Sequence, residues 1–99
     1  MLRAGAITVD TSARRATRDG ELVPLTTREL ELLSFLLAHP DRAFTRAELM
    51  AEVWGWTFGD QSTVTVHVRR LREKIEDDPT SPTLIKTVWG VGYLLETTE

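Results

Sequence analysis

The sequence contains no cysteine. Disulfide bonds and thiolate-bound metal sites are therefore excluded. The two histidines, His39 and His67, are far apart in the sequence, so we expect neither a metal site nor a cofactor. A chain without cysteine is compatible with a reducing cytoplasm, which is the location that we expect.

Long hydrophobic runs are also missing. The apolar stretches cover only a few residues each, whereas a membrane-spanning helix needs about 20. The segment from Met1 to Gly5 shows neither the apolar region nor the cleavage pattern of an export signal. We therefore expect no contact with a membrane.

The sequence motifs of common enzymes are missing as well. It contains no nucleophile-elbow pattern and no glycine-rich phosphate-binding loop. A hydrolase needs a nucleophile beside a base, but one histidine falls at a predicted helix end and the other on a basic face. We therefore expect no enzymatic activity.

The composition is that of one ordinary folded domain, residues 1–99, with 41% hydrophobic and 27% charged residues. The net charge is −3. Residues 62–74 nevertheless hold four basic side chains against one acidic one, a net +3, so the remainder carries −6. This distribution would orient the basic segment toward an anionic partner.

The first 25 residues have the pattern of short strands. We predict strands at Ala6–Asp10, Arg15–Arg18 and Glu21–Leu25, with Met1–Arg3 as a further edge. Asp19-Gly20 between two such runs indicates a type I′ hairpin turn, because both central residues of that turn have positive φ. A small antiparallel sheet is the expected result.

Two capping boxes mark the beginnings of two helices. In each, a threonine precedes a glutamate by three residues, and apolar residues flank the box as a hydrophobic staple. The first helix is predicted to begin after Thr26 and to end before Pro40. The second is predicted to begin after Thr45 and to end at Gly55.

A third helix, at about residues 60–76, divides into two unlike faces. Four apolar residues at helical spacing form one face: Val64, Val68, Leu71 and Ile75. The opposite face carries Ser62, Val66, Arg69 and Arg70, with Thr63 beside them. A helix that is anchored on one side and presents methyl and guanidinium groups on the other suits the major groove of DNA.

The ends of this third helix are predicted less sharply. Asp60 or Ser62 can cap its beginning, and its end is expected near Asp77, before Pro79. The last turn would then be acidic, which opposes the helix dipole. We interpret these acidic residues as keeping this end of the helix away from phosphate groups.

The rest of the chain predicts a second hairpin. Strands are expected at Thr83–Val88 and Tyr93–Glu96, joined around the segment from Trp89 to Gly92. A sheet, three helices and a hairpin, in this order, define an α+β winged helix-turn-helix whose wing spans about residues 83–96. With the third helix in the major groove, this wing is expected on the flanking DNA backbone or in the minor groove.

Five segments resemble the OmpR/PhoB-type effector domain of bacterial response regulators. They occur in the same order as in that family and extend over nearly the whole chain: Leu25–Leu33, Phe44–Leu49, Val53–Gly55, Thr63–Arg72 and Thr87–Tyr93. The resemblance implies a four-stranded N-terminal sheet before the three-helix bundle and the wing.

The resemblance also implies a transcriptional regulator of a two-component phosphorelay. Such a regulator follows a receiver domain and binds direct repeats of double-stranded DNA as a head-to-tail pair. A receiver has no room in 99 residues. We expect this chain to be the output domain of a longer protein and a monomer when isolated, with a stand-alone regulator as the alternative.

The contacts expected with DNA follow from chemistry and from family positions. Base contacts are assigned to Thr63, Val66, Arg69 and Arg70, because threonine and valine methyls can touch thymine and arginine can pair with guanine. His67 and Arg72, on the flanks of the helix, are expected at phosphates. The family positions suggest further phosphate contacts for Thr45, Arg46, Trp54, Lys86 and Thr87.

Two aromatic residues, Trp56 and Phe58, fall in the loop before the third helix. In the family this connection can contact RNA polymerase, which is one interpretation of the pair. The other is a loop that packs back onto the domain.

Three positions depart from the family. Ser62 and Trp89 stand where members often carry arginine, and Thr65 stands where they often carry aspartate. An indole cannot replace a guanidinium in a narrow minor groove. Trp89 is therefore expected not to read that groove, and could instead stack on sugars, pack on the core or face a neighbouring protein.

Two alternatives to DNA binding remain. Three arginines on a helix often form no more than a solvated surface. A winged helix can also serve only as a protein-interaction module, but its exposed face would then be apolar or acidic rather than basic.

Overall fold

The computed structural model describes residues 1–97 and begins with a four-stranded sheet. Its strands, β1 (Leu2–Ala4), β2 (Ile7–Asp10), β3 (Arg15–Arg18) and β4 (Glu21–Val23), pair antiparallel in sequence order. The turn between β3 and β4 has φ of 51° at Asp19 and 83° at Gly20, as a type I′ turn requires. The prediction of this hairpin, and of four strands, is confirmed.

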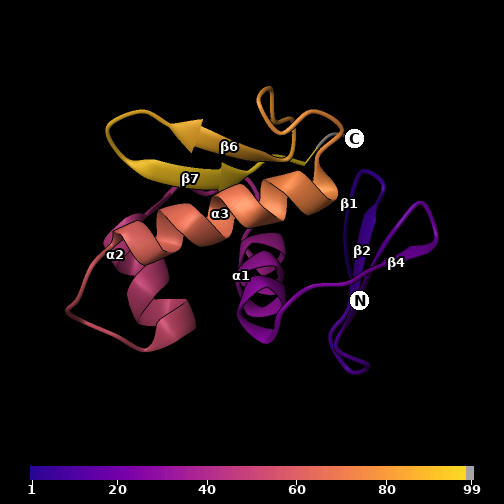
Figure 1. Ribbon diagram of the computed structural model, residues 1–99, viewed down its shortest axis with the longest axis horizontal. Coiled ribbons are helices and arrows are strands. Elements are labelled where there is room, and N and C mark those ends of the chain that lie inside the picture. Colours follow the sequence, from indigo (N-terminus) through magenta and orange to yellow (C-terminus); the bar gives the residue numbers. More distant parts are fainter. Residues whose placement is uncertain (98–99) are drawn as a thin grey trace.

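Helix α1 (Thr27–Ala38) begins at the predicted capping box. The Thr26 hydroxyl accepts a hydrogen bond from the Glu29 backbone at 3.2 Å, and Glu29 Oε1 accepts one from the Thr26 backbone at 3.0 Å. Because Pro40 disfavours helical backbone in the residue before it, the helix ends at Ala38. The leucines of α1 are buried, and the helix lies between the N-terminal sheet and the other helices (Figure 1).

The second predicted helix is present but is not regular. It consists of α2 (Arg46–Leu49), with the predicted capping box at Thr45, and continues as one π-helical segment, η1 (Met50–Trp54). Gly55 ends it with φ of 74°, in the left-handed region that glycine favours. Periodicity does not distinguish a π-helical turn from an α-helical one over five residues, so this feature was not predicted.

Helix α3 (Ser62–Ile75) has the predicted apolar face fully buried. The predicted cap was wrong: Gln61 occupies the N-cap position, and its side chain forms no capping bond. Asp60, one residue earlier, accepts the Ser62 backbone N–H on its Oδ1 at 2.9 Å. This bond lowers the pKa of Asp60 below its usual value. The predicted end near Asp77 was wrong, because Glu76 already has extended backbone and its side chain bonds to the following strand.

The wing belongs to a three-stranded sheet in the order β5-β7-β6. Strands β6 (Ile85–Val88) and β7 (Gly92–Leu95) form the predicted hairpin, and the two-residue strand β5 (Phe44–Thr45) adds to the free edge of β7. A Cβ atom at Gly92 would lie 2.0 Å from the Phe44 carbonyl oxygen. Glycine is therefore required where β5 meets the wing.

Figure 1 shows how these elements are arranged. Helix α3 crosses in front of α1, the β6–β7 hairpin lies along one side of α3, and the N-terminal sheet lies at one end. The core between them is apolar and includes Leu33, Leu36, Val68, Leu71 and Ile85. This is a winged helix-turn-helix with an N-terminal sheet. Within residues 1–97 no helix has the length and apolarity that crossing a membrane would demand.

A buried ion pair connects the beginning of α1 to α3. Glu29 is 1% exposed, and its Oε1 accepts a hydrogen bond from Lys74 Nζ at 2.6 Å. Burial by itself raises the pKa of Glu29, but hydrogen bonds from Lys74 and Thr26 and the attraction to Lys74 hold the pKa below its usual 4.5. The carboxylate thus holds α3 against α1 only while it is ionised.

This ion pair predicts a pH dependence of stability. Glu29 binds a proton less readily in the folded chain, so its stabilisation is complete above about pH 4.5 and is lost as the pH falls through the lower folded pKa. The difference in free energy of unfolding between wild type and Glu29→Gln should shrink as denaturant titrations move from pH 7 to below 4. Glu31→Gln, on the same helix, is the control. A difference that is constant with pH would contradict the assignment.

Candidate nucleic-acid interface

The outer face of α3 carries two arginines without a partner inside the domain. Arg69 and Arg70 are exposed, and the hydrogen bonds and ion pairs formed within residues 1–97 involve neither side chain. Thr63 and Val66, the other predicted base contacts, are partly exposed. The structure therefore brings the four residues together on one surface, with their polar and methyl groups directed away from the core.

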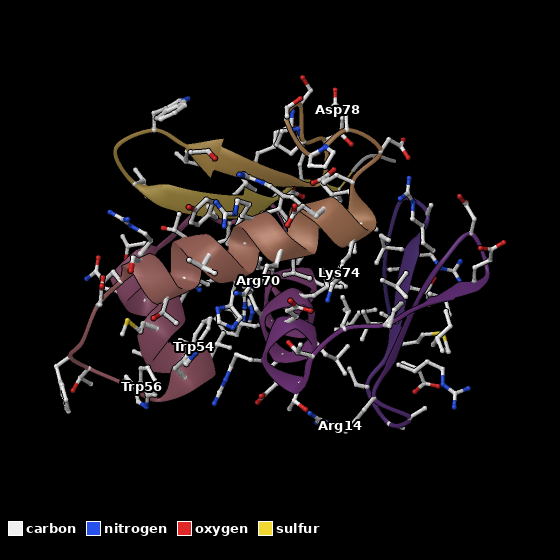
Figure 2. All side chains as sticks on the ribbon, viewed as in Figure 1. Arg14, Trp54, Trp56, Arg70, Lys74 and Asp78 are labelled. Carbon is white, nitrogen blue, oxygen red and sulfur yellow. The ribbon has the colours of Figure 1, made fainter. Side chains whose placement is uncertain are left out.

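The two arginines lean to opposite flanks of α3. At about 100° per residue, Arg69 falls on the flank toward the wing and Arg70 on the flank toward Trp54. Figure 2 shows Arg70 and Lys74 along the edge of α3 that is away from the β6–β7 hairpin. Lys74 is bound to Glu29, so Arg70 is the free cation on this flank within the described part of the chain.

Trp54 and His67 form an aromatic contact beside Arg70. Their rings meet edge to face with centroids 4.9 Å apart. Arg28 lies over the Trp54 ring at 5.5 Å and donates to the Val53 carbonyl at 2.7 Å, which fixes the end of η1. Sequence reasoning missed Arg28, although it lies inside the first capping box.

The polar atoms of this pair are directed differently. Trp54 is 8% exposed, and its indole nitrogen forms no hydrogen bond with another described residue. Every fully buried side-chain nitrogen in residues 1–97 has a hydrogen-bond partner, so this nitrogen is not fully buried. The indole N–H therefore reaches solvent. His67 Nδ1 faces the Thr63 carbonyl at 2.8 Å and must carry a hydrogen there. The other ring nitrogen can donate to a phosphate only when the ring is protonated.

Arg72 is bound to the wing, which changes its expected role. Its Nε and Nη2 donate to the Ile85 carbonyl at 3.0 and 2.8 Å, and Nη2 also donates to Thr87 Oγ1 at 2.9 Å. The guanidinium lies 5.5 Å from the Tyr93 ring, and burial lowers the pKa of Arg72 from its usual value. A phosphate contact was predicted; the geometry favours a side chain that positions β6 against α3.

Replacing Arg72 by alanine should therefore destabilise the domain by about 1–2 kcal/mol, because the Ile85 carbonyl loses its partner. The melting temperature should fall by about 5–10 °C in thermal unfolding. Thr87→Val removes only the hydroxyl bond and should cost much less. If Arg72→Ala keeps the wild-type melting temperature but lowers the salt dependence of DNA binding, the guanidinium serves phosphate instead.

Glu76 fixes the same strand from the end of α3. This residue is 4% exposed, and its two carboxylate oxygens accept backbone N–H groups of Thr83, Leu84 and Ile85 at 2.8–3.2 Å. Arg72 of α3 binds the Ile85 carbonyl, and Glu76, directly after α3, binds the Ile85 N–H. The wing and α3 are thus tied together.

The interpretation of the acidic segment as a repulsive helix end is therefore corrected. Glu76, Asp77 and Asp78 lie beyond α3, and each has a partner within the domain. Asp77 pairs with Arg18 of β3. Asp78 Oδ1 accepts the Thr80 hydroxyl at 2.6 Å and the Thr80 backbone N–H at 3.0 Å, which lowers the pKa of Asp78. These bonds shape the loop between α3 and β6.

The other predicted phosphate contacts lie around the wing. The Thr45 hydroxyl caps α2 by accepting the Glu48 N–H at 3.0 Å, and Arg46, which is exposed, donates to Thr65 Oγ1 at 3.3 Å. Lys86 is paired with Glu96 at 2.6 Å. A phosphate would have to compete with these bonds.

Three exposed aromatic residues lie outside the core. In the loop before α3, Trp56 is 48% and Phe58 84% exposed. The loop also touches the domain, since the Trp56 N–H bonds to the Met50 carbonyl at 3.2 Å. Trp89, at the tip of the wing, is 90% exposed. Glu73 is exposed on the outer face of α3, seven residues after Val66, and this spacing could have placed it beside the predicted base contacts.

Metal ligands do not gather anywhere in the described residues: no group of three or more His, Asp or Glu side chains has suitable geometry there. The unpaired arginines lie on the outer face of α3, with the wing on one flank and Trp54 on the other. A winged helix that presents unpaired arginines in this way defines the class of winged-helix DNA-binding domains.

Comparison with known proteins places the chain within that class. It matches the family described as transcriptional regulatory protein, C terminal, over residues 20–95. The DNA-binding response regulator MtrA of Mycobacterium tuberculosis is 45% identical over 94 residues, which are 94% of this chain and 41% of MtrA. The transcriptional regulatory protein ResD of Bacillus subtilis is 48% identical over 92 residues, 91% of this chain and 38% of ResD.

A solved structure supports the same placement of the chain. The DNA-binding domain of RstA from Klebsiella pneumoniae, in complex with the RstA box, has a TM-score of 0.87 and 35% identity over 96% of this chain and 95% of that domain. The chain belongs to the family of OmpR/PhoB-type DNA-binding domains of response regulators. It spans less than half of the length of MtrA and ResD.

Proposed function

We propose that this domain binds specific sequences of double-stranded DNA and regulates transcription, with α3 in the major groove. The observation that carries the proposal is the pair Arg69 and Arg70, exposed on α3 and unpaired within residues 1–97. Arginines that only contact water need not lie together on one helix face. Arginines placed in this way can bind guanine O6 and N7 in bidentate geometry.

Within this proposal the residues divide by chemistry. Arg69 and Arg70 pair with guanine or with phosphate, and the methyl groups of Thr63 and Val66 contact thymine. The Trp54 N–H binds phosphate on the flank opposite the wing. His67, whose ring meets that of Trp54, joins it there.

The remaining phosphate contacts lie on the other flank. Arg46 contributes its charge, and Thr45 and Thr87 offer hydroxyl groups close to it. Lys86 takes part only if its bond to Glu96 opens. Arg72 keeps the wing in place rather than touching DNA directly.

The relatives suggest the setting in which the domain acts. MtrA is a response regulator of more than twice this length. We infer that a receiver domain linked to this domain controls it by phosphorylation, in the cytoplasm, and that two copies bind direct repeats head to tail while the isolated domain is a monomer. No catalytic role is proposed for the domain.

The loop before α3 is proposed to contact RNA polymerase. Trp56 and Phe58 are exposed there, and aromatic side chains are enriched at protein interfaces. Replacing both by alanine should leave DNA binding intact and reduce transcription from a bound promoter in vitro.

Selection of binding sites from a pool of random duplexes tests the proposal. A shared motif should emerge, and binding to it should weaken as salt increases, because phosphate contacts release counterions. No enrichment of any motif, together with no mobility shift of random duplex at low salt, would favour the protein-only module.

A further inference from the structure

Glu73 lies on the outermost line of α3. This line repeats the spacing of the buried residues of the helix, shifted two positions toward the N-terminus, and consists of Ser62, Val66, Arg69 and Glu73. Because two residues turn a helix by about 200°, the line is nearly opposite the buried face. Glu73 is exposed. Its carboxylate is therefore directed away from the core, in line with Val66, a proposed base contact.

This carboxylate has no partner inside the domain. None of the ion pairs formed within residues 1–97 involves Glu73. Arg69 and Arg70 precede it by four and three residues, and side chains of opposite charge can pair at these spacings on a helix. Neither pair forms, and an acidic residue that follows its basic partner is the less favourable order. All three charges are therefore available to a partner outside the domain.

The other charged residues of the last turn of α3 are already bound. Arg72 donates to the Ile85 carbonyl, and Lys74 donates to Glu29. Glu73 is the one acidic residue of α3. A carboxylate close to a phosphate would be repelled, so a duplex on α3 is compatible with Glu73 only if this side chain meets the middle of the groove, away from both backbones.

The floor of the major groove offers a suitable donor there. An ionised carboxylate only accepts hydrogen bonds, and the donors in this groove are the amino groups of cytosine and adenine. The adenine amino group lies between two acceptors, its own N7 and thymine O4. The cytosine amino group has an acceptor on one side only, guanine O6, which an arginine can cover. Cytosine therefore fits a carboxylate that stands beside two arginines.

We propose that Glu73 selects cytosine, by accepting a hydrogen bond from its N4 amino group at a base pair beside those bound by Arg69 and Arg70. This inference rests on the proposed function and adds a base contact of opposite charge to it. The arginines attract every duplex through its phosphates, whereas the carboxylate disfavours each base that turns an acceptor toward it. Glu73 thus contributes to specificity more than to affinity.

Site selection and titration with Glu73→Ala test this inference. For wild type, exchanging the selected C·G pair for T·A should lower affinity about 5-fold or more, as a mismatched base pair does. For Glu73→Ala the same exchange should change affinity less than about twofold, and selection should recover a motif relaxed at that pair. The melting temperature should stay within a few degrees of wild type, because Glu73 holds no other element.

Glu73→Gln gives a gain of preference that loss of stability cannot imitate. An amide can still accept from cytosine, but it can also bind adenine N6 and N7 together. Selection with this variant should therefore admit adenine at the position that wild type restricts to cytosine. Glu21→Ala is the control, since it removes an exposed carboxylate from β4 and should leave the motif unchanged.

The outcomes separate this inference from the proposed function. If wild type selects a motif and Glu73→Ala selects the same one, the cytosine contact is refuted while α3 binding stands. The contact is also refuted if Glu73→Ala binds every duplex more tightly by the same factor, because the carboxylate then only repels DNA, or if Glu73→Gln still excludes adenine. If wild type selects no motif at all, both proposals fail.

Discussion

Arg70→Ala is expected to weaken binding to the selected duplex by about 5- to 150-fold, the loss of one bidentate base contact at about 1–3 kcal/mol. Arg70 is exposed and has no intramolecular partner in residues 1–97, so alanine removes no bond that holds the fold. The loss should therefore appear in DNA affinity, measured by titration, with an unchanged melting temperature.

The effect should also be specific to sequence. Selection with Arg70→Ala should recover a motif relaxed at one base pair, whereas Arg15→Ala, which changes an exposed arginine on the N-terminal sheet, should leave motif and affinity unchanged. An affinity within about twofold of wild type would remove Arg70 from the interface.

Glu76→Ala is expected to destabilise the domain by about 2–4 kcal/mol, since three backbone N–H groups lose a charged acceptor at once. Thermal unfolding should show a fall of about 10–20 °C in melting temperature. Because β6 is fixed through these bonds, the wing should loosen before the rest, visible as faster hydrogen exchange at Ile85.

Glu73→Ala is the matched control for this prediction. It removes a carboxylate from the last turn of α3, three residues before Glu76, but one that is exposed and has no bond to the wing. Its melting temperature should stay within a few degrees of wild type. Equal melting temperatures for both variants would show that Glu76 does not hold β6.

Most of the fold could be predicted from sequence because its signals are local. A threonine with a glutamate three residues later is enough to begin a helix, and both predicted boxes are present at Thr26 and Thr45. The turn between β3 and β4 likewise depends only on its own two residues, Asp19 and Gly20. The failures were non-local: β5 is too short for a periodic pattern and exists through pairing with β7.

The site was predictable to a smaller extent. The outer face of α3 follows from helical spacing, so Arg69 and Arg70 could be placed on one surface. Whether a cation is free depends on partners from distant segments. Lys74 and Arg72 lie in the same basic segment as Arg70, but Lys74 is bound to Glu29 and Arg72 to the Ile85 carbonyl, which the sequence does not show.

The acidic residues after α3 show the same limit. Glu76 was interpreted as an unfavourable charge at a helix end, because its partners lie seven to nine residues further on, at the start of a strand that is held by pairing with β7. The role of Glu76 follows from its burial rather than from its position at the helix end. A surface hollow lined by Trp89 also includes Arg46, which is remote in sequence, so the sequence did not predict it.

The central claim is that α3 reads the major groove, and dimethyl sulfate protection of the selected duplex tests it most directly. The reagent methylates guanine N7 in the major groove and adenine N3 in the minor groove, so one experiment compares both grooves. We predict protection of guanine N7 within the motif, lost at one guanine in Arg70→Ala. Protection confined to adenine N3, with every guanine N7 as reactive as in free DNA, would contradict it.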